Sequence, residues 1–223
     1  MIRNLLNLFK KESYCQSAWD LCLEMLNESL GMFTDAAESF HNEENLNCDI
    51  YNRDRVINKF ERKVRRDIVT HLAVSNNPDI NSALVLTSII IDIERIGDYT
   101  KNIIELAITH PGRFQGGELS QEIVEIETAV QKMFRDLIPC MENGDVDEAR
   151  RILGDHQILA GRVEDCLQDL ITGKVLATDS GAAVVAALYM RYLKRISAHL
   201  KNVASSLVNP YYRIGFREKD QSS

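Results

Sequence analysis

The stretch ERIGDYTKNI at residues 94–103 returns in altered form as KRISAHLKNV at residues 194–203. Arginine, isoleucine, lysine and asparagine recur at the same four places, so the two stretches align at a spacing of 100 residues. Asp35 in MFTDAA and Asp136 in MFRDLI align at a spacing of 101 residues. A period this long indicates a duplicated domain rather than a solenoid of short repeats.

Hydrophobic residues recur with helical spacing along most of the chain. The first helix has an apolar seam of Trp19, Leu23, Leu26, Leu30, Phe33, Ala37 and Phe40. Five further helices are predicted at about 54–72, 79–109, 120–142, 145–172 and 179–207. The fold class is therefore all-α, with two tandem three-helix bundles packed side by side. We expect a first repeat at 1–110, a linker at 111–118, a second repeat at 119–208 and a tail at 209–223.

Several residues predict where individual helices begin or end. Asp79 and Ser120 are suited to cap the third and fourth helices. Pro139 is expected to kink or end the fourth helix near Met141. Between the second and fifth helices, Ile57 is expected to match Ile158, again at a spacing of 101.

Composition narrows the class of protein. The 223 residues include 33 acidic and 26 basic ones, a net charge of −7, which argues against a general nucleic-acid-binding protein. Five cysteines form no CxxC pair, which predicts free thiols in a reducing compartment (Cys15, Cys22, Cys48, Cys140 and Cys166). Apolar runs are far shorter than the roughly 20 residues of a membrane-spanning helix. We expect a cytoplasmic protein whose N-terminal MIRNLLNLFKK is amphipathic and contacts a partner, lipid or the bundle itself.

Glu94 and Asp98 are four residues apart, so a helix places both carboxylates on one face, where they repel each other unless a cation neutralises them. The pair lies beside the apolar seam of its helix, not within it. Asp35 also lies off the seam of the first helix, and Glu61 adds a fourth carboxylate. Two interpretations stay open: a solvated, salt-bridged face, or an all-oxygen site for a hard cation.

The stretch IDIERIGDYTKNI resembles the signature of the PhoU family, regulators of phosphate transport and phosphate signalling, in which E/D-x-x-x-D occurs once per three-helix repeat. TDAAESFHNEE at residues 34–44 and DRVINKFERKV at residues 54–64 resemble other parts of the family pattern. The resemblance implies a six-helix fold and a metal ion (iron, manganese, magnesium or zinc) held by Glu94 and Asp98, with Asp35 and Glu61 as further candidates. It also implies a partner at the inner face of the membrane, either a phosphate transporter or a phosphate-sensing histidine kinase.

The second half departs from this pattern. Lys194 and Ala198 replace the two acidic residues of the motif, and neither side chain can ligate a hard cation. The counterparts expected for Glu61 and Asn58 are Arg162 and Leu159. We therefore expect no metal site in the second repeat, where Arg191, Lys194 and Arg195 supply positive charge instead.

Other repeated or conspicuous residues are assigned structural roles. Arg95 and Arg195 recur although the carboxylates do not, which favours a bridge between helices, to an acid such as Glu164 or Asp67, over a phosphate-binding role. Asn102 and Asn202 are expected to form hydrogen bonds where helices pack. Glu38 and His41 have the spacing of a di-iron ligand pair, but no second pair exists, so His41 is expected at a helix end.

The sequence thus predicts a non-enzymatic regulator with a metal site in its first repeat and a docking surface for a membrane partner. A homodimer is compatible with this prediction. Two alternatives are a helical carboxylate metalloenzyme and a helical interaction scaffold without metal.

Overall fold

The computed structural model describes residues 13–41, 49–110, 117–175, 177 and 179–218. Within these ranges the chain forms six long helices and no strand: α2 Ser13–His41, α3 Ile50–Val74, α4 Ile80–Thr109, α5 Ser120–Asn143, α6 Val146–Ile171 and α7 Ser180–Val208. Two short 3₁₀ turns, η2 Gly117–Leu119 and η3 Tyr211–Arg213, complete them. The all-α prediction is confirmed. The N-terminal amphipathic segment and Cys48 lie outside the described residues.

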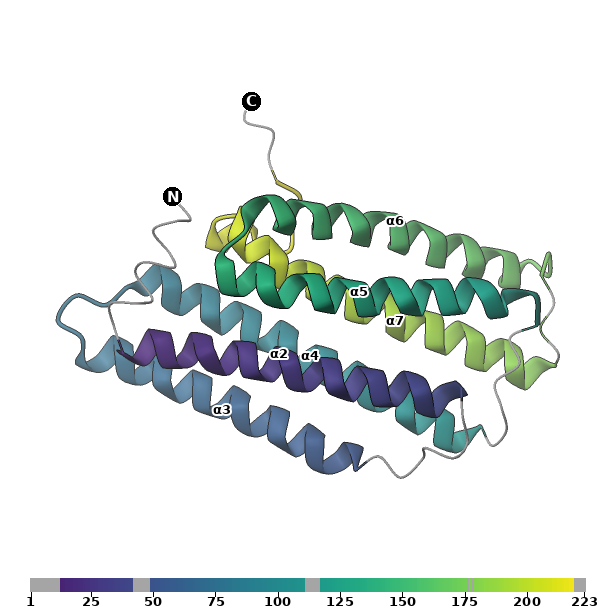
Figure 1. Cartoon of the computed structure of the whole chain (residues 1–223), viewed down its shortest axis with the longest axis horizontal. Helices are drawn as coiled ribbons and strands as arrows, with labels where there is room; N and C mark the ends of the chain where they lie inside the picture. Colours follow the sequence, from purple (N-terminus) through teal and green to yellow (C-terminus); the bar gives the residue numbers. More distant parts are fainter. Residues whose placement is uncertain (1–12, 42–48, 111–116, 176, 178, 219–223) are drawn as a thin grey trace.

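The helices form two three-helix units, α2–α3–α4 and α5–α6–α7 (Figure 1). α4 packs against α7 and α2 against α5, so these four helices make the interface between the repeats. α3 and α6 lie on opposite outer sides of the molecule (Figure 1). One hydrophobic core runs through both units without a break. The repeats are thus halves of a single body rather than separate bundles.

Burial repeats with the same spacing as the sequence. In α4 and α7, buried residues recur 100 positions apart, as in the pairs Ile93 and Leu193 or Ile103 and Val203. In α2 and α5 the spacing is 101 (Met25, Met32, Phe33 and Ala36 against Ile126, Met133, Phe134 and Leu137). Because the apolar faces coincide at these spacings, Glu94 and Lys194 occupy equivalent positions on their helices.

The predicted pairing of Ile57 with Ile158 is wrong. Ile57 is 1% exposed, whereas Ile158 is 68% exposed and Leu159, the next residue, is 3% exposed. Helices α3 and α6 therefore match at a spacing of 102. A shared residue type misled the sequence alignment, because burial rather than identity fixes which face of a helix packs on the core.

Helix ends partly follow the predictions. The Asp79 carboxylate caps α4 by accepting from the backbone N–H of Ser82, as expected. Ser120 does not cap α5, because the turn η2 precedes it and the N-cap position is Leu119, which makes no side-chain cap bond. Pro139 does not end α5 either. The helix continues until Gly144, whose φ of 62° is a left-handed conformation that glycine adopts without strain.

One carboxylate joins the two repeats at their interface. Asp92 of α4 lies 2.7 Å from Nδ1 of His199 and 2.8 Å from Nδ2 of Asn202, both on α7. The side chains of Asp92 and His199 are only 14% and 19% exposed. This confirms the packing role predicted for Asn202.

A second polar contact crosses the interface elsewhere. Glu127 of α5 accepts a hydrogen bond from the Tyr189 hydroxyl of α7 and lies 2.8 Å from Nε2 of His41, at the end of α2 as predicted. The Tyr189 ring stacks on Phe40 with 3.8 Å between centroids. Burial, and then the Glu127 charge, raise the pKa of Tyr189, so its hydroxyl stays protonated and able to donate.

The described cysteines are free and buried, as predicted (Cys15, Cys22, Cys140 and Cys166). Burial raises the pKa of Cys22 and raises that of Cys140 to about 12, so these thiols are poor nucleophiles. Within the ranges given above, no helix has a stretch apolar and long enough to span a bilayer.

Asp92→Ala should destabilise the protein by about 1–3 kcal/mol, because it leaves His199 and Asn202 at the interface without their shared acceptor. Urea denaturation measures the change. Glu142→Ala, on the exposed surface of α5, should alter stability by less than about 0.5 kcal/mol. Equal effects of the two substitutions would show that Asp92 contributes nothing special to the interface.

Candidate functional site

Four carboxylates gather where α3 and α4 pack together: Asp54 and Glu61 from α3, and Glu94 and Asp98 from α4. We call them the acidic cluster. Burial raises the pKa of Glu94, and the charges of Asp98, Glu61 and Asp54 raise it further, against an opposing effect of Arg95. Crowding of this kind favours any positive charge that enters the cluster.

A glycine within the motif allows the two helices to come this close. A Cβ atom at Gly97 would lie 3.3 Å from Cγ2 of Ile57 on α3, tighter than ordinary van der Waals contact. Gly97 is fully covered, between Glu94 and Asp98 in sequence. The glycine of ERIGD therefore lets α3 approach the helix face that carries the two acidic residues.

Basic side chains of the protein neutralise part of the cluster. The ammonium of Lys101 lies 3.1 Å from Asp54 and 3.3 Å from Asp98. The guanidinium of Arg95 lies 2.9 Å from Asp98 and 3.6 Å from Glu94. In the described part of the chain, no three His, Cys, Asp or Glu side chains are arranged to hold a metal ion. Cation binding at the cluster would therefore require Lys101 or Arg95 to move aside.

The four predicted metal ligands do not all meet. Glu94 and Asp98 share the cluster with Glu61, which also pairs with Arg65 at 2.7 Å. Asp35 instead forms an ion pair with Arg53 of α3 and is not among the main charges that shift the pKa of Glu94.

Asp54 is the member of the cluster that the sequence analysis missed. It lies seven residues before Glu61, hence two helical turns away on the same side of α3. Its partner Lys101 is one of the four residues repeated between the two halves. A lysine three residues after Asp98, on the same face of α4, was the available signal for a further carboxylate nearby.

The bridge predicted for Arg95 is wrong. Arg95 pairs with Glu94 and Asp98 of its own helix, which are one and three residues away from it in the sequence. Glu164 pairs with Lys194, and Asp67 accepts a hydrogen bond from the hydroxyl of Ser17 at 3.4 Å.

The second repeat has no carboxylate at the equivalent positions and carries one positive charge there, that of Lys194. Lys194 and Ala198 stand where α4 has Glu94 and Asp98, and at the spacing of 102 residues His156 stands where α3 has Asp54. The counterparts predicted for Glu61 and Asn58 are therefore wrong. At the spacing of 102 residues, Glu61 corresponds to Val163 rather than Arg162, and Asn58 corresponds to Ala160 rather than Leu159. Arg162 itself points to α5, where it pairs with Glu122 and Glu125.

Comparison with known proteins gives two matches to one family model. The PhoU domain model matches residues 22–107 and again residues 123–207. Two relatives, each named phosphate-specific transport system accessory protein PhoU homolog, come from Pseudomonas putida and Pseudomonas aeruginosa. They are 25% and 24% identical over 158 residues, 70% of this chain. The match spans 62% and 65% of their lengths, less than two thirds.

Two crystal structures have the same fold. PhoU from Pseudomonas aeruginosa aligns with a TM-score of 0.69 at 22% identity, over 93% of this chain and 97% of that one. The phosphate transport system regulatory protein PhoU from Streptococcus pneumoniae aligns with a TM-score of 0.67 at 15% identity, over 93% and 95%. Identities this low establish the arrangement of helices alone.

Glu94→Gln should stabilise the metal-free protein at neutral pH by a few tenths of a kcal/mol, because it removes repulsion within the acidic cluster. The pKa of Glu94 is raised above 4.5, so the folded state holds this proton more tightly than the unfolded state. Wild-type stability should therefore fall, relative to the variant, as the pH rises through that raised pKa.

Urea denaturation in EDTA at pH values from 4 to 7.5 measures the difference. Glu142→Gln, at an exposed position of α5, is the control and should show no such gain. If Glu94→Gln tracks the wild type at every pH, the cluster exerts no net repulsion on this residue.

Proposed function

This chain belongs to the PhoU family, and from that premise we propose that it is a non-enzymatic regulator of phosphate transport. In this proposal the acidic cluster binds a metal ion and the helical body docks on a phosphate transporter or a phosphate-sensing histidine kinase. The names of the two Pseudomonas relatives support the transport role. The observation that carries the metal site is the crowding of three carboxylates around Glu94, two of which, Asp54 and Asp98, share Lys101.

The chemistry of the acidic cluster suits a hard cation. Its donors are all carboxylate oxygens, which magnesium, manganese and iron accept readily, whereas zinc more often takes nitrogen or sulfur. Glu94, Asp98, Asp54 and Glu61 would hold the ion, and the Lys101 ammonium would give up its place between Asp54 and Asp98. The ion would supply charge neutralisation and a rigid link between α3 and α4.

A metal-free scaffold is the second candidate, and one observation favours it. Lys101 and Arg95 already compensate the carboxylates of the cluster without any ion. In that case the cluster would stabilise the contact between α3 and α4, and regulation would depend on protein contacts alone.

Metal analysis separates these two candidates. Wild-type protein should carry bound metal and melt at a higher temperature when Mn²⁺, Mg²⁺, Fe²⁺ or Zn²⁺ is added, because a ligand of the native state stabilises it by mass action. The double substitution Glu94→Gln and Asp98→Asn should lose both the metal and the thermal shift. Elemental analysis and thermal melting are the measurements.

The matched control is Asp165→Asn with Asp169→Asn, a carboxylate pair with the same four-residue spacing on α6. It should keep the metal content of the wild type. If the cluster variant and the control bind equal amounts of metal, the scaffold is correct and the metal site is not.

The docking part of the proposal follows from how a rigid body can regulate a transporter. A protein that binds one conformation of its partner better than another shifts the partner's equilibrium toward that conformation. No catalytic step is required of this chain. The continuous core through both repeats makes the body suited to present one fixed surface.

Affinity purification from native membranes tests the partner. Tagged wild-type protein should enrich a phosphate transporter or a phosphate-sensing kinase over an untagged control, as identified by mass spectrometry at high and low phosphate. The metal-site double variant is run in parallel, so that loss of metal and loss of docking are distinguished. Recovery of neither class of partner under both conditions would contradict the proposed regulation.

A further inference from the structure

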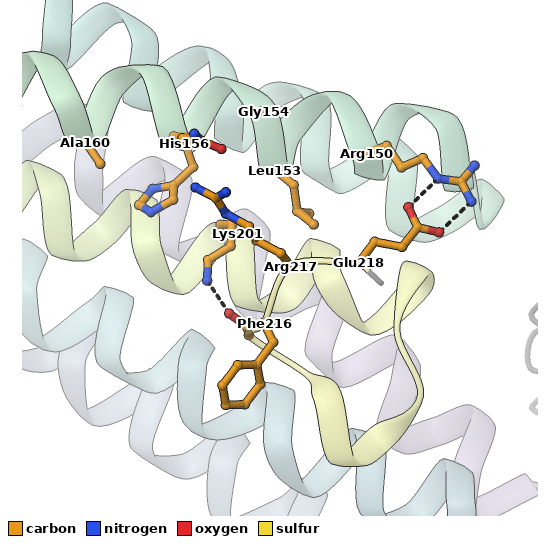
Figure 2. A pocket seen from close by; sticks show the side chains of 11 residues that line it. Arg150, Leu153, Gly154, His156, Ala160, Lys201, Phe216, Arg217 and Glu218 are labelled. Carbon is orange, nitrogen blue, oxygen red and sulfur yellow. Dashed lines mark hydrogen bonds and ion pairs between the residues drawn. The ribbon is translucent and has the colours of Figure 1, made fainter. Parts of the chain in front are cut away.

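A cavity of about 450 Å³ lies in the second repeat, between α6, α7 and the segment that follows α7. Three basic side chains line it together with His156: Arg150 from α6, Lys201 from α7 and Arg217 from the C-terminal segment. Figure 2 shows Arg217 reaching between the two helices toward His156, while Glu218 extends to Arg150. We call this the basic cavity.

The C-terminal wall of the basic cavity is fastened by specific hydrogen bonds. The backbone N–H of Gly215 donates to the Ser205 hydroxyl at 2.7 Å, and the Asn209 amide donates to the carbonyl of Phe216 at 2.7 Å. Gly215 has a φ of 85°, and a Cβ there would lie 3.0 Å from Oδ1 of Asn202. Glycine is therefore needed for the wall to lie this close to α7.

Lys201 in this cavity is the repeat counterpart of Lys101, but its surroundings are reversed. Lys101 contacts two carboxylates, those of Asp54 and Asp98. The Lys201 ammonium is partly buried and donates to a neutral group, the carbonyl of Gly215, at 2.6 Å. Burial lowers the pKa of Lys201, because the charged ammonium is less stable out of water. Lys201 also has no contact with a carboxylate, whereas Lys101 contacts two.

Asp92 is the carboxylate whose charge acts on Lys201, but it does not form an ion pair with the ammonium. Asp92 raises the pKa of Lys201 against the effect of burial. Its carboxylate is already engaged by His199 and Asn202, and it forms no ion pair with Lys201. The two residues that would match the carboxylates around Lys101 are His156 and Ala198, and neither is an anion.

The other charges of the cavity add to the excess. Among the described residues the Arg217 side chain forms no ion pair, whereas Arg150 pairs with Glu218 through bonds of 2.8 and 2.9 Å and with Asp147 at 2.8 Å. Burial, then the charges of Lys201 and Lys194, lower the pKa of His156 to about 4, so it is neutral at pH 7. Lys201 and Arg217 are thus the two cations of the cavity that form no ion pair with another described residue.

We propose that the basic cavity binds a small anion carrying a phosphate group, either free phosphate or a phosphate ester. Lys201 and Arg217 would contact the phosphate oxygens, because a guanidinium fork and an ammonium together match several oxygens of one phosphate. The volume is within the range of small-molecule sites, and Leu153 and Ala160 give part of the lining an apolar surface for an organic group. This inference does not rest on the metal site or on the proposed docking.

Isothermal titration calorimetry with inorganic phosphate, glucose 6-phosphate and adenosine monophosphate tests the proposal, with glucose and adenosine as uncharged controls. At least one phosphate compound should bind saturably with a Kd below about 1 mM in 0.15 M salt. Binding of the esters alone would identify a phosphorylated small molecule as the ligand, and equal binding of inorganic phosphate would identify the free anion. No saturable binding of any of the three would overturn the proposal.

Charge-removing variants locate the site. Lys201→Gln and Arg217→Gln should each weaken binding about tenfold, because each removes a charged hydrogen-bond donor. Lys101→Gln, at the equivalent place in the first repeat, should leave the Kd unchanged, and so should the double substitution of Glu94 and Asp98 used above. Glu218→Gln should tighten binding, since it removes the cavity's own carboxylate. Binding that is insensitive to both Lys201→Gln and Arg217→Gln would place the anion elsewhere and refute the proposed site.

Discussion

The packing of α4 against α7 is the contact on which the rest of the molecule depends. The two helices are equivalent parts of the two repeats, and their buried faces coincide at a spacing of 100 residues. Each helix also packs on its own repeat, α4 on α2 and α3, and α7 on α5 and α6. A charged side chain on these buried faces would disturb both repeats at once, so the duplicated helices can differ in charge only at partly exposed positions.

The charge reversal between the repeats is confined to such positions. Glu94 and Asp98 are partly exposed on α4, and so are Lys194 and Ala198 on α7. Lys101 and Lys201 stay the same, and what changes is the group each one meets, carboxylates in the first repeat and a backbone carbonyl in the second. One scaffold thus presents an anionic surface and a cationic cavity from equivalent places.

Sequence reasoning correctly predicted the features of the fold that the spacing of apolar residues determines. The six helices, their order and the duplication follow from apolar spacing, and the Asp79 cap follows from local chemistry. It failed where tertiary contacts decide, because burial sets the register of α6 against α3. It also failed for Arg95, whose ion pairs lie within its own helix rather than between helices. Asp54 was missed because the contact with Lys101 joins two helices.

The basic cavity was out of reach for a further reason: its third wall comes from residues after the last helix, for which the sequence predicted only a tail at 209–223. Gly215 and Lys201 bring that wall onto α7. The neighbouring Asn202 contacts Asp92, which lies only two residues before Glu94 on α4. A single carboxylate therefore stands between the helix that lines the cavity and the helix that carries the acidic cluster. A displacement of α7 at Lys201 would therefore alter the contacts that Asp92 makes with His199 and Asn202 across the interface.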